Sequence, residues 1–504
     1  MMADLTDDVF NLRSELLPFL VLSLQLVVSY VARLALTVID SAFLGHVGTN
    51  ELAGASLATL WIEFPLNTVS GMASALIALC GQAFGAKNYL LMGIWLQMAL
   101  ILITVLAVPT MVWYFFLGGI LHHTTDDSAV IAFGARFAEF LSPSIWPLLA
   151  YVCLRQYLQA MGVVMPTTIN GIVCIGVDIG ANYLLIYTAG LGFDGSPLAT
   201  VIAAWFQPIA LFLYAFVYKK HHKDAWGGWK LSELTWSRWK TFFRMALPLG
   251  LNEGCEFLAA AALSFVVAKM GANVLATHAI LSSIYTLVNA IFVGVGLAAA
   301  VGLAEHLGGS RPRAARARFY LGFATLVCVA VIVACILWFG RRSVVGVFTT
   351  DDRIVVLFLD VLPLYLAAAS LRSLDMGLVT SFMGMGQMGF VSIATAVALW
   401  GVQLPLAYYF GIVKDLGLLG VWTAATIAAA VKVTIMSVRF LCIDWQKMVH
   451  DAMAGAEAGD QKLSTATDVD EDISWESSGS SSIYLIASPP THNKERDAWH
   501  VTFI

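Results

Sequence analysis

The strongest constraint on this chain is a series of long apolar segments. A segment of about 20 mostly apolar residues is long enough to cross the hydrocarbon core of a bilayer. Because lipid offers the backbone no hydrogen bonds, such spans form helices, so the sequence predicts an all-α polytopic membrane protein. Twelve segments qualify, at approximately 17–44, 52–80, 91–117, 129–160, 165–188, 197–218, 243–268, 274–304, 317–339, 354–383, 388–411 and 418–443.

Composition excludes several other classes of protein. Of the 504 residues, 59% are hydrophobic and only 12% are charged, whereas soluble domains average about 25% charged residues. The seven cysteines are scattered, with neither disulfide nor metal spacing. No basic tract indicates a nucleic acid partner, and no GK[ST] triplet provides a Walker A loop. We expect no cofactor and no metal site. Any uphill transport by such a chain would have to use an ion gradient.

The basic residues predict the orientation. The loop after the sixth segment has seven Lys and Arg residues between positions 219 and 244, and the loop after the eighth has four between 311 and 318. Loops on the opposite side carry fewer. Since cytoplasmic loops are enriched in Lys and Arg, these two loops and both termini are predicted to be cytoplasmic.

The two halves of the chain repeat. "GTNELAGASLA" from Gly48 aligns with "GANVLATHAIL" from Gly271, and "GQAFGAK" from Gly81 aligns with "AEHLGGS" from Ala304, both at an offset of 223 residues. "TTDD" at 124–127 recurs at 349–352. Halves of six spans enter the membrane from the same side, as parallel repeats about an axis along the membrane normal. We therefore predict two six-helix lobes related by a pseudo-two-fold axis around a V-shaped central cavity.

These observations divide the chain into five parts. They are a cytoplasmic N-terminus (1–16), an N-lobe (17–218), a cytoplasmic linker (219–242), a C-lobe (243–445) and a disordered cytoplasmic tail (446–504). The linker region is rich in Trp, as is typical of interfacial amphipathic segments. The tail is acidic and Ser-rich, which is typical of disorder. Its last residues, "VTFI", are compatible with a PDZ protein as partner through strand addition, although many C-termini end this way by chance.

Four motifs carry a family resemblance. They are "VIDSAFLGHVG" in the first span, "LCGQAFGAKNY" after the second, "DIGANYLLIY" in the fifth, and "WGGWKLSELTWSRWKTFFRMALP" before the seventh. In this order and spacing, the chain resembles the eukaryotic branch of the multidrug and toxic compound extrusion (MATE) family, over roughly residues 15–445. The resemblance implies an exporter of drugs or metabolites that is driven by H⁺ or Na⁺ antiport, with H⁺ favoured for a eukaryotic member.

The resemblance also implies roles for particular acids. Glu256 stands at the family's acid in the seventh span, Asp375 at that of the tenth and Asp40 at that of the first. Asp178 and Asn182 match a polar pair in the fifth span that works with the first-span acid. The chain departs from animal members, which often lack acids matching Asp40 and Asp375. It also has Glu305 where many members have Asn.

The same acids stand out on physical grounds, because an ionisable residue inside a span is costly and is usually functional. Glu253 and Glu256 share one face of a helix at i, i+3. Two carboxylates at that distance do not both ionise easily in a low dielectric, which favours proton exchange near neutral pH. We predict Glu256 as the coupling acid and Glu253 as supporting. The alternative is that Glu253 lies near the cytoplasmic end and is simply hydrated.

Two further groups involve charges of other spans. Arg372 and Asp375, also at i, i+3, form either an ion pair that fixes the tenth span or a second cation or proton site. Asp40 is expected to face Asp178 and Asn182, in a cluster whose oxygens suit a hydrated proton or Na⁺. The alternative there is a buried hydrogen-bond network that only fixes helix packing.

The remaining intramembrane charges are Arg33, Glu63, Arg155 and Lys432. Glu63 is predicted to line the central cavity. Arg155 is expected to extend its charged end toward the cytoplasmic interface.

The favoured hypothesis is therefore a secondary active antiporter that exports organic cations or amphiphiles. A lipid or glycolipid flippase is the second hypothesis, and a receptor or channel the third. Acids outnumber bases inside the membrane, which favours a cationic substrate over lipid phosphates, and the two-lobe repeat argues against a channel. No nucleophile–base constellation supports an enzyme. The plasma membrane is the expected location, with a vacuolar or vesicular membrane as the alternative.

Overall fold

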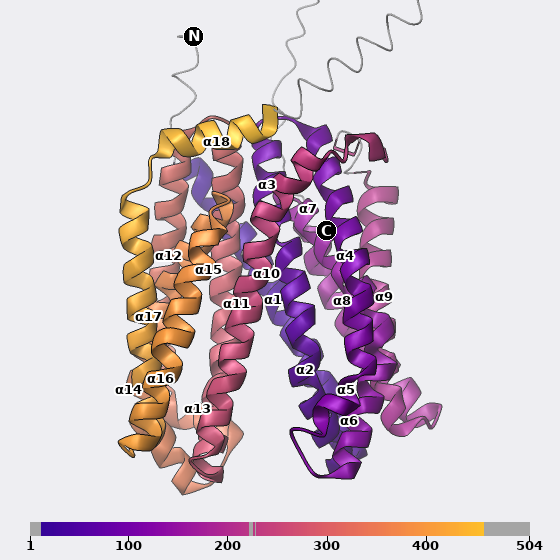
Figure 1. Cartoon of the computed structure of the whole chain (residues 1–504), viewed down its shortest axis with the longest axis vertical. Helices are drawn as coiled ribbons and strands as arrows, with labels where there is room; N and C mark the ends of the chain where they lie inside the picture. The colour runs from indigo at the N-terminus through magenta and orange to yellow at the C-terminus, as the bar shows by residue number, and fades with distance from the viewer. Residues whose placement is uncertain (1–11, 221–224, 227, 458–504) are drawn as a thin grey trace, which may run out of the picture. The chain divides into compact units, whose positions relative to one another are not determined.

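The computed structural model describes residues 12–457 except 221–224 and 227, and all regular structure in that part of the chain is helical (Figure 1). Twelve of the described helical segments are long and apolar enough to cross a membrane. They begin with Glu15–Val47 and end with Gly417–Leu441, and each coincides within a few residues with a segment predicted from the sequence. The predicted fold class is confirmed.

The first six spans are built from nine α-helices. They are α1 (Leu12–Val47), α2 (Thr49–Ala73), α3 (Ala75–Gly85), α4 (Tyr89–Phe115), α5 (Leu117–Leu121), α6 (Ser128–Leu141), α7 (Ile145–Ala160), α8 (Met165–Tyr183) and α9 (Gly195–Phe212). Short π-helical segments, Leu184–Thr188 and Leu213–Tyr218, extend α8 and α9.

The second half contains the remaining α-helices. They are α10 (Trp236–Ala268), α11 (Ala272–Gly308), α12 (Pro312–Phe339), α13 (Arg341–Phe348), α14 (Asp352–Gly384), α15 (Met388–Ala396), α16 (Leu404–Tyr408), α17 (Gly417–Leu441) and α18 (Trp445–Glu457). Two π-helical segments, Val397–Gln403 and Tyr409–Val413, make α15 and α16 parts of one span.

Each copy of the "TTDD" motif supplies the Asp that caps the following helix, the second Asp in the first half and the first Asp in the second half. The side chain of Asp127 accepts a hydrogen bond from the backbone N–H of Ala129 at 2.9 Å and caps α6. Asp351 accepts one from the N–H of Arg353, also at 2.9 Å, and caps α14. An Asp at this position satisfies backbone donors that a helix start leaves unpaired. Both halves therefore start a helix here with an Asp cap, at an offset of 224 residues, one less than the offset that aligns the motif letters.

The repeated Gly-rich motifs meet each other where the two lobes touch. A Cβ added to Gly85 at the end of α3 would collide with the carbonyl oxygen of Glu305 on α11. A Cβ added to Gly308, the repeat partner of Gly85, would collide with the carbonyl oxygen of Gln82, the repeat partner of Glu305. This reciprocal contact is what a two-fold axis between like surfaces produces. Gln82 adds a hydrogen bond across the lobes, from its Nε2 to the carbonyl of Gly384 at 3.1 Å.

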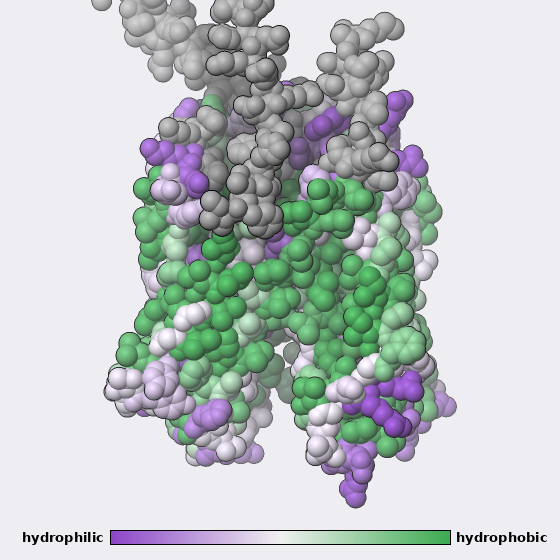
Figure 2. All heavy atoms as spheres, turned by 180° about the vertical axis from the view of Figure 1, so that it is seen from behind, coloured by the Kyte–Doolittle hydropathy of each residue, from purple (hydrophilic) through white to green (hydrophobic). Residues whose placement is uncertain are grey.

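The lobes are closed at one end and separated at the other. Contacts of α1 with α11 and of α2 with α10 join them. In Figure 1, α2 and α10 diverge toward the end that carries α6 and α13. Figure 2 shows an apolar belt and a hollow between the lobes at that same end. The predicted V-shaped arrangement is present, and the closed end is the one predicted to be cytoplasmic.

The chain after the last span differs from the prediction. The tail was expected to be disordered from residue 446, but residues 445–457 form α18. Its apolar side chains Met448, Val449 and Ala452 are buried against Leu303 and Leu307 of α11 and further residues of the C-lobe. Burial of this face explains why a short polar-rich segment is helical, since packing rather than propensity supplies most helix stability. The remaining tail, with the predicted PDZ-binding end, lies outside the described residues.

Candidate functional site

A cavity of about 650 Å³ contains the acids of the seventh and tenth spans. Its walls come mainly from α10, α11, α14 and α17 of the C-lobe, and Leu60 and Asn67 of α2 face it from the N-lobe. Glu253, Glu256 and Asp375 all line it. Three of the predicted acids therefore lie in one cavity, and this cavity belongs mostly to the C-lobe.

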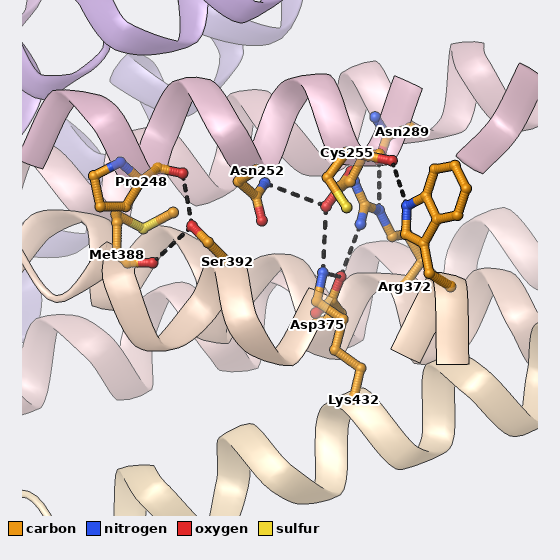
Figure 3. Close-up of polar contacts among 11 residues, drawn as sticks. Pro248, Asn252, Cys255, Asn289, Arg372, Asp375, Met388, Ser392 and Lys432 are labelled. Carbon is orange, nitrogen blue, oxygen red and sulfur yellow. Dashed lines mark hydrogen bonds and ion pairs between the residues drawn. The ribbon is translucent and has the colours of Figure 1, made fainter. Parts of the chain in front are cut away.

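Four charged side chains in this cavity form a closed ring of ion pairs, which we call the charge cluster (Figure 3). Glu256 accepts from Arg372 Nη2 at 3.1 Å and from Lys432 Nζ at 3.3 Å. Asp375 accepts from Arg372 Nη1 at 2.8 Å and from the same Lys432 Nζ at 3.1 Å. Two anions and two cations alternate, so the charge cluster is neutral when both acids are ionised.

Two amides extend the charge cluster. Asn289 of α11 accepts from Arg372 Nε at 3.0 Å through its Oδ1, and Asn252 donates to Glu256 Oε1 at 3.4 Å. Asp375 Oδ1 is buried and has no hydrogen-bond partner among the described residues. Buried charges persist when they are paired and hydrogen-bonded, and here one carboxyl oxygen is left over.

Glu253 behaves differently from Glu256, although the two share a helix face. It is exposed to the cavity and lies against α2, where a Cβ on Gly71 would sit 2.7 Å from Glu253 Cγ. The sequence argument relied on repulsion between these two acids. In the structure, however, Glu256 forms ion pairs with Arg372 and Lys432. With Glu253 included, the ionised cavity contains three carboxylates and two cations.

The N-lobe acids also meet as predicted. Asp40 of α1 accepts from Asn182 Nδ2 of α8 and from the hydroxyl of Thr200 on α9, each at 3.0 Å. Asp178 of α8 is an electrostatic neighbour of Asp40. The Asp178 Oδ2 is buried and has no hydrogen-bond partner among the described residues. Thr200 is a member that sequence reasoning missed, because a single Thr in an apolar span carries no charge signal.

Removing the amide from this N-lobe cluster should lower stability. We expect Asn182→Ala to lower the free energy of unfolding by about 1–3 kcal/mol, since it removes one of the two donors to the partly buried Asp40 carboxyl. Thermal unfolding of the purified protein in detergent measures this. Ser41→Ala is a control, because the Ser41 hydroxyl is exposed and donates only to the backbone carbonyl of Thr37 on its own helix. Equal melting of both variants would contradict the expectation.

Glu63 and Arg155 were the least constrained of the intramembrane charges. Glu63 is partly buried on α2, with the charge of Arg33 as an electrostatic neighbour. The cavity described above is lined by its helix neighbours Leu60 and Asn67 instead. Arg155 does not extend to the interface as expected. It is 4% exposed and lies over the rings of Tyr30 and Tyr151 at 5.3 and 5.8 Å, a cation–π arrangement.

Aromatic side chains also contribute to the cavity wall. Phe257, Tyr285 and Trp422 do so, and the Tyr285 and Trp422 rings are 6.4 Å apart. Sequence reasoning expected aromatic lining but had no means of choosing among 15 Trp and 29 Phe residues. Lys432 was recognised as an intramembrane charge, but its pairing with two acids from other spans depends on which helix faces meet.

Comparisons with known proteins agree with this architecture. The family model MatE matches residues 26–184 and 248–409, one segment in each lobe. The rabbit (Oryctolagus cuniculus) multidrug and toxin extrusion protein 2 is 27% identical over 422 residues, which cover 83% of this chain and 69% of the relative. The human (Homo sapiens) multidrug and toxin extrusion protein 1 is 27% identical over 447 residues, covering 88% of this chain and 78% of the relative.

A solved structure shows the same fold. The crystal structure of the eukaryotic MATE transporter AtDTX14 superposes with a TM-score of 0.81 at 22% identity, over 88% of this chain and 99% of that one. The relatives and structural neighbours are transporters and not enzymes, in agreement with the sequence-based expectation. With the family model covering more than half of the residues and both lobes, the chain belongs to the MatE family of multidrug and toxin extrusion transporters.

Proposed function

We propose that this transporter exports organic cations or amphiphiles in exchange for H⁺, by alternating access, with Glu256 as the coupling acid. The observation that carries the proposal is the charge cluster in the aromatic-lined cavity. The ionised cavity has one carboxylate more than it has cations, so it attracts a cation. Aromatic faces add cation–π attraction.

Protonation of Glu256 reverses that preference. A neutral Glu256 leaves Arg372 and Lys432 to share Asp375, so the cluster becomes positive and the whole cavity loses its excess negative charge. A bound organic cation and this proton then oppose each other electrostatically. Competition between proton and substrate for one site is the linkage that exchange requires. On the more acidic side of the membrane, protonation would release the substrate.

Of the two alternatives, Na⁺ coupling keeps specific support and the flippase does not. The N-lobe cluster offers oxygens from Asp40, Asp178, Asn182 and Thr200, which suit Na⁺ as the coupling ion. A lipid or glycolipid flippase would need cationic groups for phosphate, and the excess of carboxylates in the cavity disfavours it. For location we propose the plasma membrane, with a vacuolar or vesicular membrane as the alternative.

A comparison of substrates tests the proposal. Proteoliposomes with a pH gradient should accumulate a fluorescent organic cation but not a neutral analogue of matched size. A Na⁺ gradient at equal pH should give no accumulation. Accumulation driven only by Na⁺ would move the coupling to the N-lobe cluster. Translocation of a fluorescent phospholipid without cation uptake would favour the flippase.

A further inference from the structure

A second cavity lies at the closed end of the lobes. Its volume is about 750 Å³, and both lobes line it. From the N-lobe, Gln82 of α3 and Trp95 of α4 line it. The C-lobe contributes Arg244 of α10, Gln387 just before α15, and Arg439 of α17. The two cavities have no lining residue in common, although α10 and α17 contribute to both.

The charge of the second cavity is opposite to that of the first. Arg244, Arg439 and Lys447 line it, against the single carboxylate of Asp451. Among the described residues, that carboxylate is paired only with His450, at 4.0 Å. No ion pair in the described part of the chain engages Arg244 or Lys447. Three cationic side chains with no anionic partner in the described structure give this cavity a positive charge that attracts an anion.

Helix α18 forms one wall of this cavity and brings its cations together. The buried face of α18 anchors it on α11 and α12, and it also contacts α3 of the N-lobe. Gln387 connects α18 to Arg439. Its Nε2 donates to the sulfur of Met448 on α18 at 3.1 Å, and its Oε1 accepts from Arg439 Nη2 at 3.3 Å. Lys447 precedes Met448 on the same helix, so docking of α18 fixes the place of two of the three cations.

The surroundings narrow the class of anion. The cavity is far larger than a carboxylate and lies at the end of the spans, where phospholipid headgroups are found. Basic pockets between helices at the cytoplasmic surface suit phosphate-bearing headgroups, and the planar guanidinium of Arg matches phosphate with paired hydrogen bonds.

We infer that the second cavity binds a phosphate-bearing anion, from a lipid headgroup or a soluble compound, and that the bound anion stabilises the conformation closed at this end. The anion would contact groups from both lobes. Separation of the lobes at this end breaks part of those contacts, so the ligand has different affinities for the two conformations, which is the condition for shifting their populations. This inference does not depend on the substrate or the coupling ion.

Binding measurements on the full-length protein test it. Nanodiscs of phosphatidylcholine with and without a phosphoinositide provide the lipid arm, and inositol hexakisphosphate added to lipid-free detergent micelles provides the soluble arm. We expect at least one probe to bind and to raise the melting temperature. Arg244→Gln/Lys447→Gln should weaken that binding at least about tenfold, since it removes two of the three cations that would form charge-assisted hydrogen bonds with the anion. Added salt should weaken wild-type binding.

A matched control removes two cations elsewhere. Arg341→Gln/Arg342→Gln makes the same change in net charge on α13, at the opposite end of the spans, and should leave binding unchanged. Binding in only one arm identifies the source of the phosphate and supports the inference. Equal binding to wild type and Arg244→Gln/Lys447→Gln, or no binding of either probe, would overturn it. Both results are independent of transport assays.

Discussion

Glu256→Gln is expected to abolish accumulation of an organic cation driven by a pH gradient. The amide cannot be ionised at any pH used, so the site no longer alternates between a charge that holds a cation and a neutral form that releases it. Arg372 and Lys432 each lose one of their two carboxylate partners. Uptake into proteoliposomes with an imposed pH gradient measures the loss directly.

The same substitution should also reduce stability, and this effect has to be separated from transport. Removing one partner of a buried ion pair costs about 3–5 kcal/mol, and we expect the lower end because the Glu256 side chain retains 23% exposure. Asp360→Asn is a control on α14, where the acid is exposed and lies outside the cavity. If a monodisperse Glu256→Gln protein still concentrated the cation along the pH gradient, Glu256 would not be the coupling acid.

Ala at Gly85 or Gly308 is expected to drive the lobes apart at their closed end. Each added Cβ would collide with a backbone carbonyl of the other lobe, and backbone atoms cannot swing away as a side-chain tip can. Overpacking of this kind costs about 1–3 kcal/mol, which shifts a two-state equilibrium by about fivefold to more than a hundredfold. Spin-label distances between the turns after α3 and α11 should lengthen, and transport should slow.

These turns suit the measurement because they are repeat partners. Lys87 and Ser310, 223 positions apart, both adopt positive φ, at 59° and 57°, so each lobe presents the same turn. Gly180→Ala is the matched control, since a Cβ there meets nothing within 4 Å and Ala favours the helix. Unchanged distances in both Gly85→Ala and Gly308→Ala would show that this contact does not set the conformation.

Most of the fold followed from the sequence. Span length and apolar runs are set by bilayer thickness, so the twelve spans were predictable from local sequence alone. The internal repeat predicted the pseudo-two-fold axis, and the reciprocal contact of Gly85 and Gly308 lies where that repeat places it. Helix α18 was not predicted, because its composition resembles a polar tail and its stability comes from burial on α11.

The site was predictable only in part. Glu256, Asp375, Asp40 and Asp178 were identified because a charge inside an apolar span is conspicuous, and Asn182 was implied by the family resemblance. The sequence offered the Arg372–Asp375 ion pair as one alternative, and the structure has that pair, but it did not predict that Arg372 and Lys432 also bind Glu256. That contact depends on the rotation of three helices about their axes, which apolar composition on all sides leaves undetermined. Arg155 was mispredicted for the same reason, since its burial depends on two Tyr residues from different helices.

The most direct test of the central claim measures proton movement caused by the substrate. Proteoliposomes loaded with an organic cation and a luminal pH dye would be diluted into substrate-free buffer with equal pH and Na⁺ on both sides. Because coupling is reciprocal, exit of the cation should draw protons in. The lumen should become more acidic for wild type but not for Glu256→Gln. Exit of the cation from wild-type vesicles with no change in luminal pH would contradict proton exchange through the charge cluster.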